Sequence, residues 1–277
     1  MNLIAKHCIR VGKRIFFNFD KPLYSAKLYR FCRKHEGFYN GESLPDQGKN
    51  GEYRVLKIIA QNARTIVDVG ANTGLFTKLS RACAPAHCTI HAFEPDGASF
   101  KKLKQLIQTH NFTNVVTNES AVGEVVEKKT FQIKARSVLN SFYTHPRTET
   151  TASVIIPVTT LDTYCTEQGI TRIDFLKIDT EGHDLFVLRG ARELLKERRI
   201  DCIQFELAQE SVYAKVFLKD FTDLLSSYGY EVCKLRSQDL MPFTYDPSHE
   251  RFTYMNYVAL SPELPPVLRS KLINAKK

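Results

Sequence analysis

Residues 65–95 are TIVDVGANTGLFTKLSRACAPAHCTIHAFEP, and this stretch decides the fold. It begins with a β-branched run at 65–69 and ends with a second one at 88–93, and a helical pattern spans about 74–83 between them. A strand, a helix and a second strand in this order form a βαβ unit with parallel strands. The turn after the first strand is where such folds receive a nucleotide-like ligand.

That turn has the residues expected of a ligand loop. Asp68 closes the first strand, and Gly70, Asn72 and Gly74 follow in the string Gly-Ala-Asn-Thr-Gly. A glycine lets the backbone turn sharply and approach a ligand where a Cβ would clash. Glu94 ends the second strand, where its carboxylate can accept hydrogen bonds from both hydroxyls of a ribose. The two elements together predict a nucleotide-like cofactor.

Two other interpretations of the turn remain. NAD-binding folds carry Gly-x-Gly-x-x-Gly, and here those positions hold Gly70, Asn72 and Leu75, so the second and third glycines are missing. The missing glycines disfavour NAD. The simpler alternative is a turn that only joins strand to helix, with Glu94 as a solvated strand end.

Outward from this unit the chain alternates strands and helices. We expect further strands at 114–120, 173–179 and 200–207, and helices at about 97–110, 183–198 and 217–227. Repeated βα winding predicts a Rossmann-like α/β fold, with a seven-stranded, mostly parallel sheet and helices on both faces. The last two strands, 230–235 and 252–260, have no helix between them, which predicts an antiparallel terminal hairpin at the sheet edge.

The winding also predicts the domain limits. Residues 123–160 interrupt it with two expected strands, KKTFQIK and SVIIPVTT, around a polar loop, and we interpret them as an insertion at the ligand end of the sheet. The domain itself is expected to span residues 51–262. Before it we expect a basic helical N-terminal extension and a connecting loop over 1–50, and after it a peripheral C-terminal tail over 263–277.

The positive charge is concentrated at the start of the chain. The net charge is +9, and residues 1–35 hold nine Lys and Arg against one acid, Asp20. Such a segment could contact an anionic membrane or an acidic partner, and a helix packed on the domain explains the pattern as well. No specific nucleic-acid partner is expected. No stretch reaches the roughly 20 apolar residues of a membrane span. The seven cysteines lack a Cys-x-x-Cys pair and favour a reduced, cytoplasmic protein.

Three strings resemble a known family. DVGANTG at 68–74, FEP at 93–95 and above all DFLKIDTEGHDLFVLRGA at 174–191 are similar to the FkbM-type class I S-adenosylmethionine-dependent methyltransferases. The resemblance covers residues 51–260 and leaves the basic extension out. It implies an enzyme that methylates a hydroxyl oxygen on a sugar, glycoconjugate or secondary metabolite, and N-methylation stays open.

The resemblance also implies where S-adenosylmethionine would bind. The cofactor contacts that it implies are Asp68, Gly70, Asn72, Gly74, Glu94, Pro95, Ser120, Ala121 and Asp179. Residues 120–122, after the third strand, are expected near the adenine. Asp68 is expected either to orient the loop or to reach the amino group of the methionine portion.

The ends of the fourth and fifth strands supply the candidate catalytic residues. Asp179 and Glu206 stand there, at the same edge of the sheet as the glycine turn. We expect Asp179 to act as a base or, with Glu206, as a ligand of a divalent cation such as magnesium. The alternative is that these acids only orient loops or cap a helix. His183 is a further candidate, as a base or as a capping residue. Lys177 is expected to pair with Asp68 or Glu206.

Substrate choice is assigned to the insertion. The candidate contacts with a small-molecule or glycan acceptor are Ser137, Asn140, Ser141 and Glu181. Tyr143 and His145 lie on the same loop, which is long enough to close over a substrate. A plain surface loop is the alternative. A third functional hypothesis is a non-catalytic cofactor-binding scaffold that docks through its basic N-terminus.

Overall fold

The computed structural model describes residues 31, 49–144 and 148–273, so the predicted basic extension lies, apart from Phe31, outside the described residues. The strands of the large sheet are β1 (Thr65–Val69), β2 (Thr89–Phe93), β3 (Val115–Asn118), β7 (Ile173–Ile178), β8 (Ile200–Leu207), β9 (Glu231–Leu235), β10 (Leu240–Pro242) and β11 (Met255–Leu260). A small sheet contains β4 (Ala121–Val122), β5 (Glu127–Lys134) and β6 (Thr150–Thr159).

The helices are α3 (Glu52–Ala60), α4 (Leu75–Cys83), α5 (Gly97–Thr109), α6 (Leu161–Glu167), α7 (Asp184–Arg189), α8 (Arg192–Lys196), α9 (Glu210–Ala214), α10 (Leu218–Ser227) and α11 (Pro266–Ile273). Two short 3-10 helices are η1 (Ser137–Leu139) and η2 (Pro247–His249). Among these helices none has the length and hydropathy that crossing a bilayer requires. The five cysteines in the described part of the chain are free thiols.

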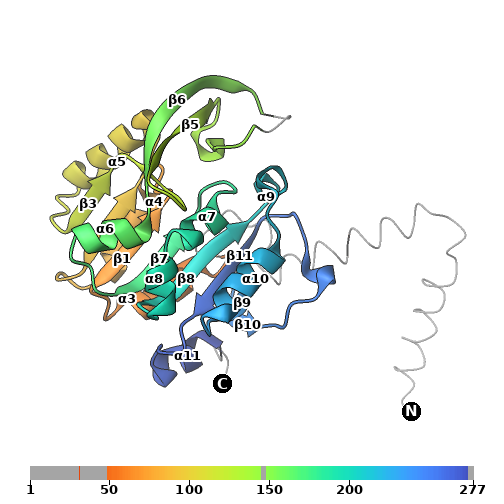
Figure 1. The fold of residues 1–277 in the computed structure, drawn as a ribbon. Helices are drawn as coiled ribbons and strands as arrows, with labels where there is room; N and C mark the ends of the chain where they lie inside the picture. The colour runs from red at the N-terminus through yellow and green to blue at the C-terminus, as the bar shows by residue number, and fades with distance from the viewer. Residues whose placement is uncertain (1–30, 32–48, 145–147, 274–277) are drawn as a thin grey trace, which may run out of the picture. The chain divides into compact units, whose positions relative to one another are not determined.

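The large sheet confirms the expected fold class. Its order is β10-β9-β11-β8-β7-β1-β2-β3, and the five strands from β3 to β8 run parallel (Figure 1). The two closing strands β9 and β11 pair antiparallel as expected, but β11 lies between β8 and β9 and not at the sheet edge. All six residues of β11 are buried, which suits an internal strand. The short β10 adds an eighth strand at the edge, beside β9.

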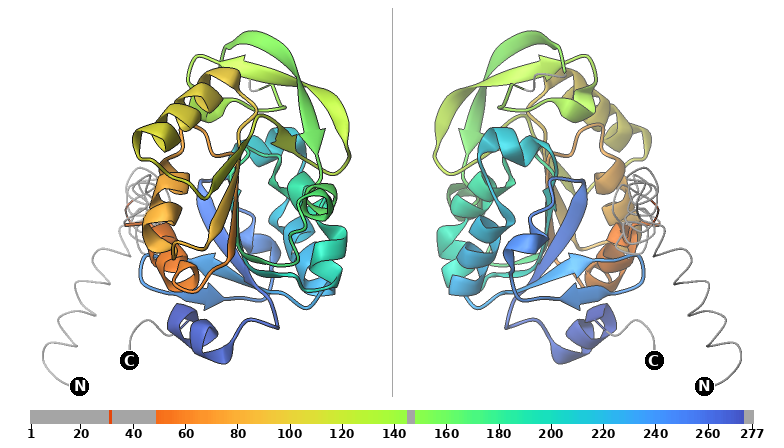
Figure 2. Two further views of the ribbon diagram at one scale, coloured as in Figure 1. Left: turned by 90° about the vertical axis from the view of Figure 1, so that its left-hand side faces the viewer. Right: turned by 90° about the vertical axis from the view of Figure 1, so that its right-hand side faces the viewer.

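Helices cover both faces of this sheet, as the side views show (Figure 2). Successive strand residues point to opposite faces, so Ile66 and Phe175 pack under α3, α4 and α11, while Val67 and Leu176 pack under α6, α7, α8 and α10. Each face therefore buries a separate apolar core, and the carboxyl ends of the parallel strands are left for a ligand.

The small sheet occupies the region expected as an insertion. The two strands predicted within 123–160 are present as β5 and β6, which pair antiparallel, and β4 pairs parallel with β6. Phe131, Ile156 and Val158 form an apolar cluster on one face of this sheet. In Figure 1 the small sheet extends beyond the large one, at the upper edge of the view.

Two expected elements differ from the structure. The helix predicted at 183–198 is divided into α7 and α8 at Gly190, where an added Cβ would overlap the backbone oxygen of Gly123. The tail expected to be peripheral contains α11, whose Leu272 is fully buried. Arg54 of α3 donates hydrogen bonds to the backbone oxygens of Lys271 and Leu272, so the chain packs on the domain as far as this helix.

Candidate active site

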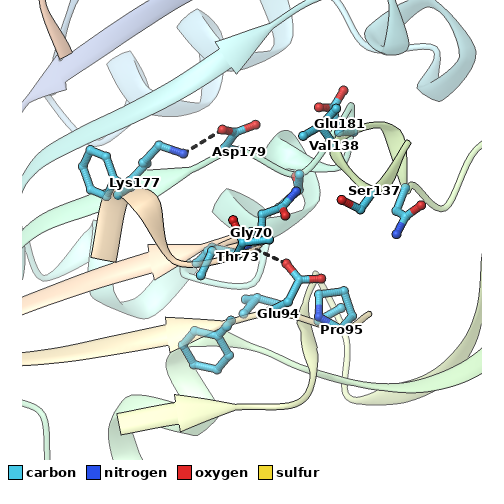
Figure 3. Close-up of a pocket in the computed structure, with 18 of the residues that line it drawn as sticks. Gly70, Thr73, Glu94, Pro95, Ser137, Val138, Lys177, Asp179 and Glu181 are labelled. Atoms are coloured by element: carbon cyan, nitrogen blue, oxygen red, sulfur yellow. Dashed lines mark hydrogen bonds and ion pairs between the residues drawn. The ribbon is translucent and has the colours of Figure 1, made fainter. Parts of the chain in front are cut away.

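A cavity of about 260 Å³ opens at the carboxyl ends of β1, β2 and β7. The glycine turn after β1, the Glu94–Pro95 corner after β2 and four residues of the insertion, Ser137, Val138, Asn140 and Phe142, line it (Figure 3). The predicted residues that line it are Gly70, Asn72, Glu94, Pro95, Ser120, Ala121, Ser137, Asn140, Asp179 and Glu181. The predicted residues outside the lining are Asp68, Gly74, Ser141, His183 and Glu206.

The glycine turn is held by backbone geometry. Gly70 has a φ of +84°, and a Cβ on it would overlap the backbone oxygen of Asp179. The N–H groups of Gly70 and Ala71 both donate to the backbone oxygen of Phe93, at 3.0 and 2.8 Å. Gly70 is therefore required for the close approach of β1 to β7. Gly74 has a different partner, because a Cβ there would lie 2.7 Å from Leu103 of α5.

Glu94 carries a buried carboxylate at the cavity wall. Its Oε2 accepts the N–H of Asn72 at 2.7 Å, and its Oε1 accepts the N–H of Asp96 at 2.9 Å. Burial raises the pKa of Glu94 to about 7, against the lowering effect of these two hydrogen bonds. The carboxylate is thus fixed by backbone donors and titrates near neutral pH.

Asp68 lies below the cavity rather than in it. The side chain is fully buried, and the hydroxyl of Thr77 donates to Oδ2 at 2.6 Å. Oδ1 has no hydrogen-bond partner among the described residues, and burial raises the pKa of Asp68 although Lys177 lowers it. Of the two roles expected for Asp68, this position suits orientation of the loop through α4.

Asp179 is the carboxylate that faces the cavity from β7. Its side chain is 34% exposed, and Nζ of Lys177 donates to Oδ2 at 2.7 Å (Figure 3). Lys177 is therefore bonded to Asp179, and not to Asp68 or Glu206 as predicted. Burial opposes the charge of Lys177, but Asp179, Asp68 and Glu52 together raise its pKa above the usual value. Lys177 thus stays protonated beneath Asp179.

Three further carboxylates lie near Asp179. Burial and then the neighbouring carboxylates raise the pKa of Glu181 and of Glu206 well above the usual value, and burial raises that of Asp184 to about 6. Asp184 accepts the hydroxyl of Thr180 at 2.8 Å and the N–H of Glu206 at 3.2 Å. Asp184 was not singled out from the sequence. Its place four residues after Thr180, at the start of a helix, was the available signal.

Within residues 49–144 and 148–273, no group of three or more His, Cys, Asp or Glu side chains is arranged to hold a metal ion. Asp179 and Glu206, expected as possible ligands of a divalent cation, differ in position: Asp179 lines the cavity and Glu206 does not. The described residues therefore do not support the expected magnesium site.

His183 is packed away from the cavity. The ring is 2% exposed, stacks on Phe186 at 4.7 Å between centroids and contacts Phe142 at 4.4 Å. Nδ1 lies 3.0 Å from the hydroxyl of Tyr143. Burial, reinforced by Lys129, lowers the pKa of His183 to about 3. Of the two roles expected for His183, this neutral, enclosed imidazole outside the cavity lining does not suit a catalytic base, and His183 stands at the N-cap position of α7 without a side-chain cap bond.

The insertion covers one side of the cavity. Ser137 and Asn140 line it, whereas Ser141 is fully buried and its hydroxyl donates to the backbone oxygen of Glu181 at 2.7 Å. His145 lies outside the described residues. Val122, expected near the adenine with Ser120 and Ala121, also lines the cavity, and the lining residues that sequence analysis missed are Val69, Ala71, Thr73, Leu75, Phe76, Phe93, Phe131, Val138, Phe142, Lys177 and Thr180. Most of them are apolar and resemble core residues in sequence, so spacing could not single them out.

Comparison with known proteins supplies the family. The family model described as Methyltransferase FkbM domain matches residues 68–232, more than half of the chain. Methyltransferase 1 of Beauveria bassiana is 30% identical over 145 residues, which cover 45% of this chain and 57% of that protein. The hexuronic acid methyltransferase AglP of Haloferax volcanii is 25% identical over 205 residues, covering 69% of this chain and 76% of that protein.

A solved structure was also found. The FkbM methyltransferase of Methylobacillus flagellatus is 18% identical with a TM-score of 0.46, and the match covers 71% of this chain and 43% of that one. The chain thus spans little more than half the length of the Beauveria relative and less than half of the Methylobacillus one. The match of the family model to residues 68–232 shows that the chain belongs to the FkbM methyltransferase domain family.

Proposed function

We propose that this protein is an S-adenosylmethionine-dependent methyltransferase that methylates a hydroxyl oxygen of a small molecule or glycan. The observation that carries the proposal is one cavity with Glu94 on one wall, Asp179 on another and the glycine turn between them (Figure 3). The family membership supports methyl transfer. The hexuronic acid methyltransferase among the relatives supports a sugar acceptor, and a secondary metabolite bearing a hydroxyl fits the same chemistry.

The residues present fit S-adenosylmethionine. Each carboxylate oxygen of Glu94 accepts one backbone N–H, which leaves lone pairs on both oxygens for the two ribose hydroxyls. Phe93, Ala121 and Val122 line the cavity and would supply apolar surface to hold the adenine. The absence of a Cβ on Gly70 keeps the turn close to β7. When bound, S-adenosylmethionine supplies the activated methyl group.

We infer that Asp179 accepts the proton of the acceptor hydroxyl. Lys177 holds Oδ2, so Oδ1 is left to accept the proton of an acceptor hydroxyl that lies in the cavity. The buried ammonium of Lys177 fixes the orientation of the carboxylate. Alignment of the hydroxyl with the methyl group supplies most of the remaining acceleration.

Ligand binding tests the cofactor. S-adenosylhomocysteine should raise the midpoint of thermal unfolding and NAD should leave it unchanged. Stabilisation by neither ligand would instead support a scaffold without a cofactor. A panel of hydroxyl-bearing and amine-bearing acceptors, assayed for production of S-adenosylhomocysteine, then separates O-methylation from N-methylation.

Substitution tests the base. Asp179→Asn should lower kcat about 100-fold or more while S-adenosylhomocysteine affinity changes far less. The matched control is Asp223→Asn, because Asp223 pairs with Lys219 on the surface. Turnover of Asp179→Asn at the parent rate would remove the proton-accepting role.

A further inference from the structure

The loop between β7 and α7 carries more than the carboxylate of Asp179. Glu181 lines the cavity and His183, two residues later, lies behind it. The segment Ser137–Tyr143 of the insertion, here called the roof segment, is bonded to both residues. The hydroxyl of Ser141 donates to the backbone oxygen of Glu181 at 2.7 Å, and the hydroxyl of Tyr143 shares a hydrogen bond with Nδ1 of His183 at 3.0 Å.

Backbone hydrogen bonds between Ser141 and Gln132, 2.9 and 3.2 Å long, hold the roof segment to β5, and the two side-chain bonds attach it to the β7–α7 loop. Ser137, Val138, Asn140 and Phe142 line the cavity, and Ser141 and Tyr143 do not. Phe142 is additionally placed between Phe131 of β5 and the His183 ring, at 5.2 and 4.4 Å between centroids. The lining residues of the roof segment thus alternate with residues that attach it to the β7–α7 loop.

The surroundings of His183 are shaped to hold its ring. The ring stacks on Phe186 within an interplanar angle of 14°, and Gly123 leaves room for it, since a Cβ there would lie 3.1 Å from Nε2. The backbone N–H of His183 bonds the oxygen of Thr180, which ties the ring to the same turn as Asp179 and Glu181. A neutral imidazole suits this place, because an imidazolium would be buried among aromatic rings near Lys129.

We propose, on the basis of the proposed function, that Ser141, Tyr143 and His183 are positioning residues that fasten the roof segment over the bound cofactor. They set how tightly the cofactor and its product are held, and His183 takes no proton in the reaction. The fastening joins the roof to the loop that carries Asp179, so cofactor retention and the placement of the carboxylate are coupled.

The experiment compares two Tyr–His hydrogen bonds of the same protein, one part-buried and one buried. Tyr143→Phe removes the bond to His183, and the control Tyr164→Phe removes the bond of the Tyr164 hydroxyl to Nδ1 of His91, 2.8 Å long, together with the bond that it accepts from Nδ2 of Asn118 at 3.2 Å. Neither Tyr164 nor His91 lines the cavity. Calorimetric titration with S-adenosylhomocysteine should give an affinity about 5-fold weaker in Tyr143→Phe, the worth of one net hydrogen bond, and an unchanged affinity in Tyr164→Phe.

Three further measurements separate the outcomes. Ser141→Ala combined with Tyr143→Phe should weaken binding about 20-fold, whereas His183→Phe combined with Tyr143→Phe should be no weaker than either single variant, because the two groups act through one bond. Amide hydrogen exchange over 137–143, measured without ligand, should accelerate in Tyr143→Phe and not in Tyr164→Phe. With an identified acceptor, His183→Phe should change KM for the cofactor more than kcat.

The inference is overturned if Tyr143→Phe binds S-adenosylhomocysteine as the parent does, if Tyr164→Phe weakens binding equally, or if His183→Phe abolishes kcat at unchanged affinity. Failure of the parent protein itself to bind S-adenosylhomocysteine would instead overturn the proposed function. In that case unchanged exchange over 137–143 in Tyr143→Phe would separately overturn the attachment of the roof segment.

Discussion

The cavity has two sides that are built differently. Its floor, the glycine turn together with the Glu94 corner, lies within the βαβ unit of residues 65–95 and is held by backbone hydrogen bonds such as those from Gly70 and Ala71 to Phe93. Its roof segment is held to β5 by a pair of backbone hydrogen bonds between Ser141 and Gln132, and to the β7–α7 loop by two side-chain hydrogen bonds, each to a residue 40 positions further along the chain. The floor is held by backbone bonds within one βαβ unit, whereas the attachment of the roof to the β7–α7 loop depends on a few side chains.

The largest effect is expected from a substitution in the floor of the cavity. Gly70→Ala places a Cβ against the backbone of Asp179 at a φ of +84°, and we expect a loss of about 3 kcal/mol or more in the free energy of unfolding, together with loss of S-adenosylhomocysteine binding. Denaturant unfolding and titration measure both. Gly169→Ala is the control, since its φ is +65° with no atom within 4 Å of the added Cβ, and it should cost about 1 kcal/mol. Equal losses in the two variants would contradict the argument from close approach.

The next largest effect is expected when the buried positive charge beneath Asp179 is removed. Lys177→Met leaves Asp68 and Asp179 without their cation, and we expect the free energy of unfolding to fall by about 3 kcal/mol. In Lys219→Met, which breaks the exposed pair with Asp223, the change should stay within about 0.5 kcal/mol. Denaturant unfolding compares them. A small loss in Lys177→Met would mean that the carboxylates take up protons at little cost.

Cofactor binding should depend on pH through Glu94. Its pKa is raised to about 7, and ribose hydroxyls require the ionised acceptor, so S-adenosylhomocysteine affinity should be about 10-fold weaker at pH 6 than at pH 8. The pH dependence of folding stability that comes from Glu94 has the opposite sign to that of cofactor binding. The contribution of Glu94 to folding is present below about pH 4.5 and is lost as the pH rises through about 7.

Titrations across this range in Glu94→Gln should show weak binding without that pH dependence, while Tyr143→Phe should keep the dependence of the parent. These two variants distinguish the floor from the roof segment, because the titrating carboxylate of Glu94 belongs to the floor. A pH profile that survives in Glu94→Gln would assign the titration to another group, such as Asp184, whose pKa is about 6.

The smallest expected effect concerns an exposed side chain of the roof. Val138 lines the cavity and is 47% exposed, so Val138→Ala should change the free energy of unfolding by no more than about 0.5 kcal/mol and S-adenosylhomocysteine affinity by less than about 3-fold. Thermal unfolding and titration check this. A larger loss of affinity than in Tyr143→Phe would show that contact of the roof with the ligand matters more than its attachment.

Local pattern was enough for most of the fold. The strands at 65–69, 88–93 and 173–179 and the glycine turn were placed within a residue or two, because β-branched runs and positive φ are short-range requirements. The three-residue β10, which contains Pro242, offers no such pattern and exists because β9 pairs with it. The internal place of β11 is likewise a matter of which strands it meets.

The sequence by itself determined the α/β winding, the floor of the cavity and the family, because these depend on residues close together along the chain. The tertiary structure decided that Lys177 bonds Asp179, that Asp68 is buried below the cavity and that His183 attaches the roof segment. The physical reason is that burial and the choice of partner set the role of a polar side chain, and both depend on residues that meet only when the chain is folded.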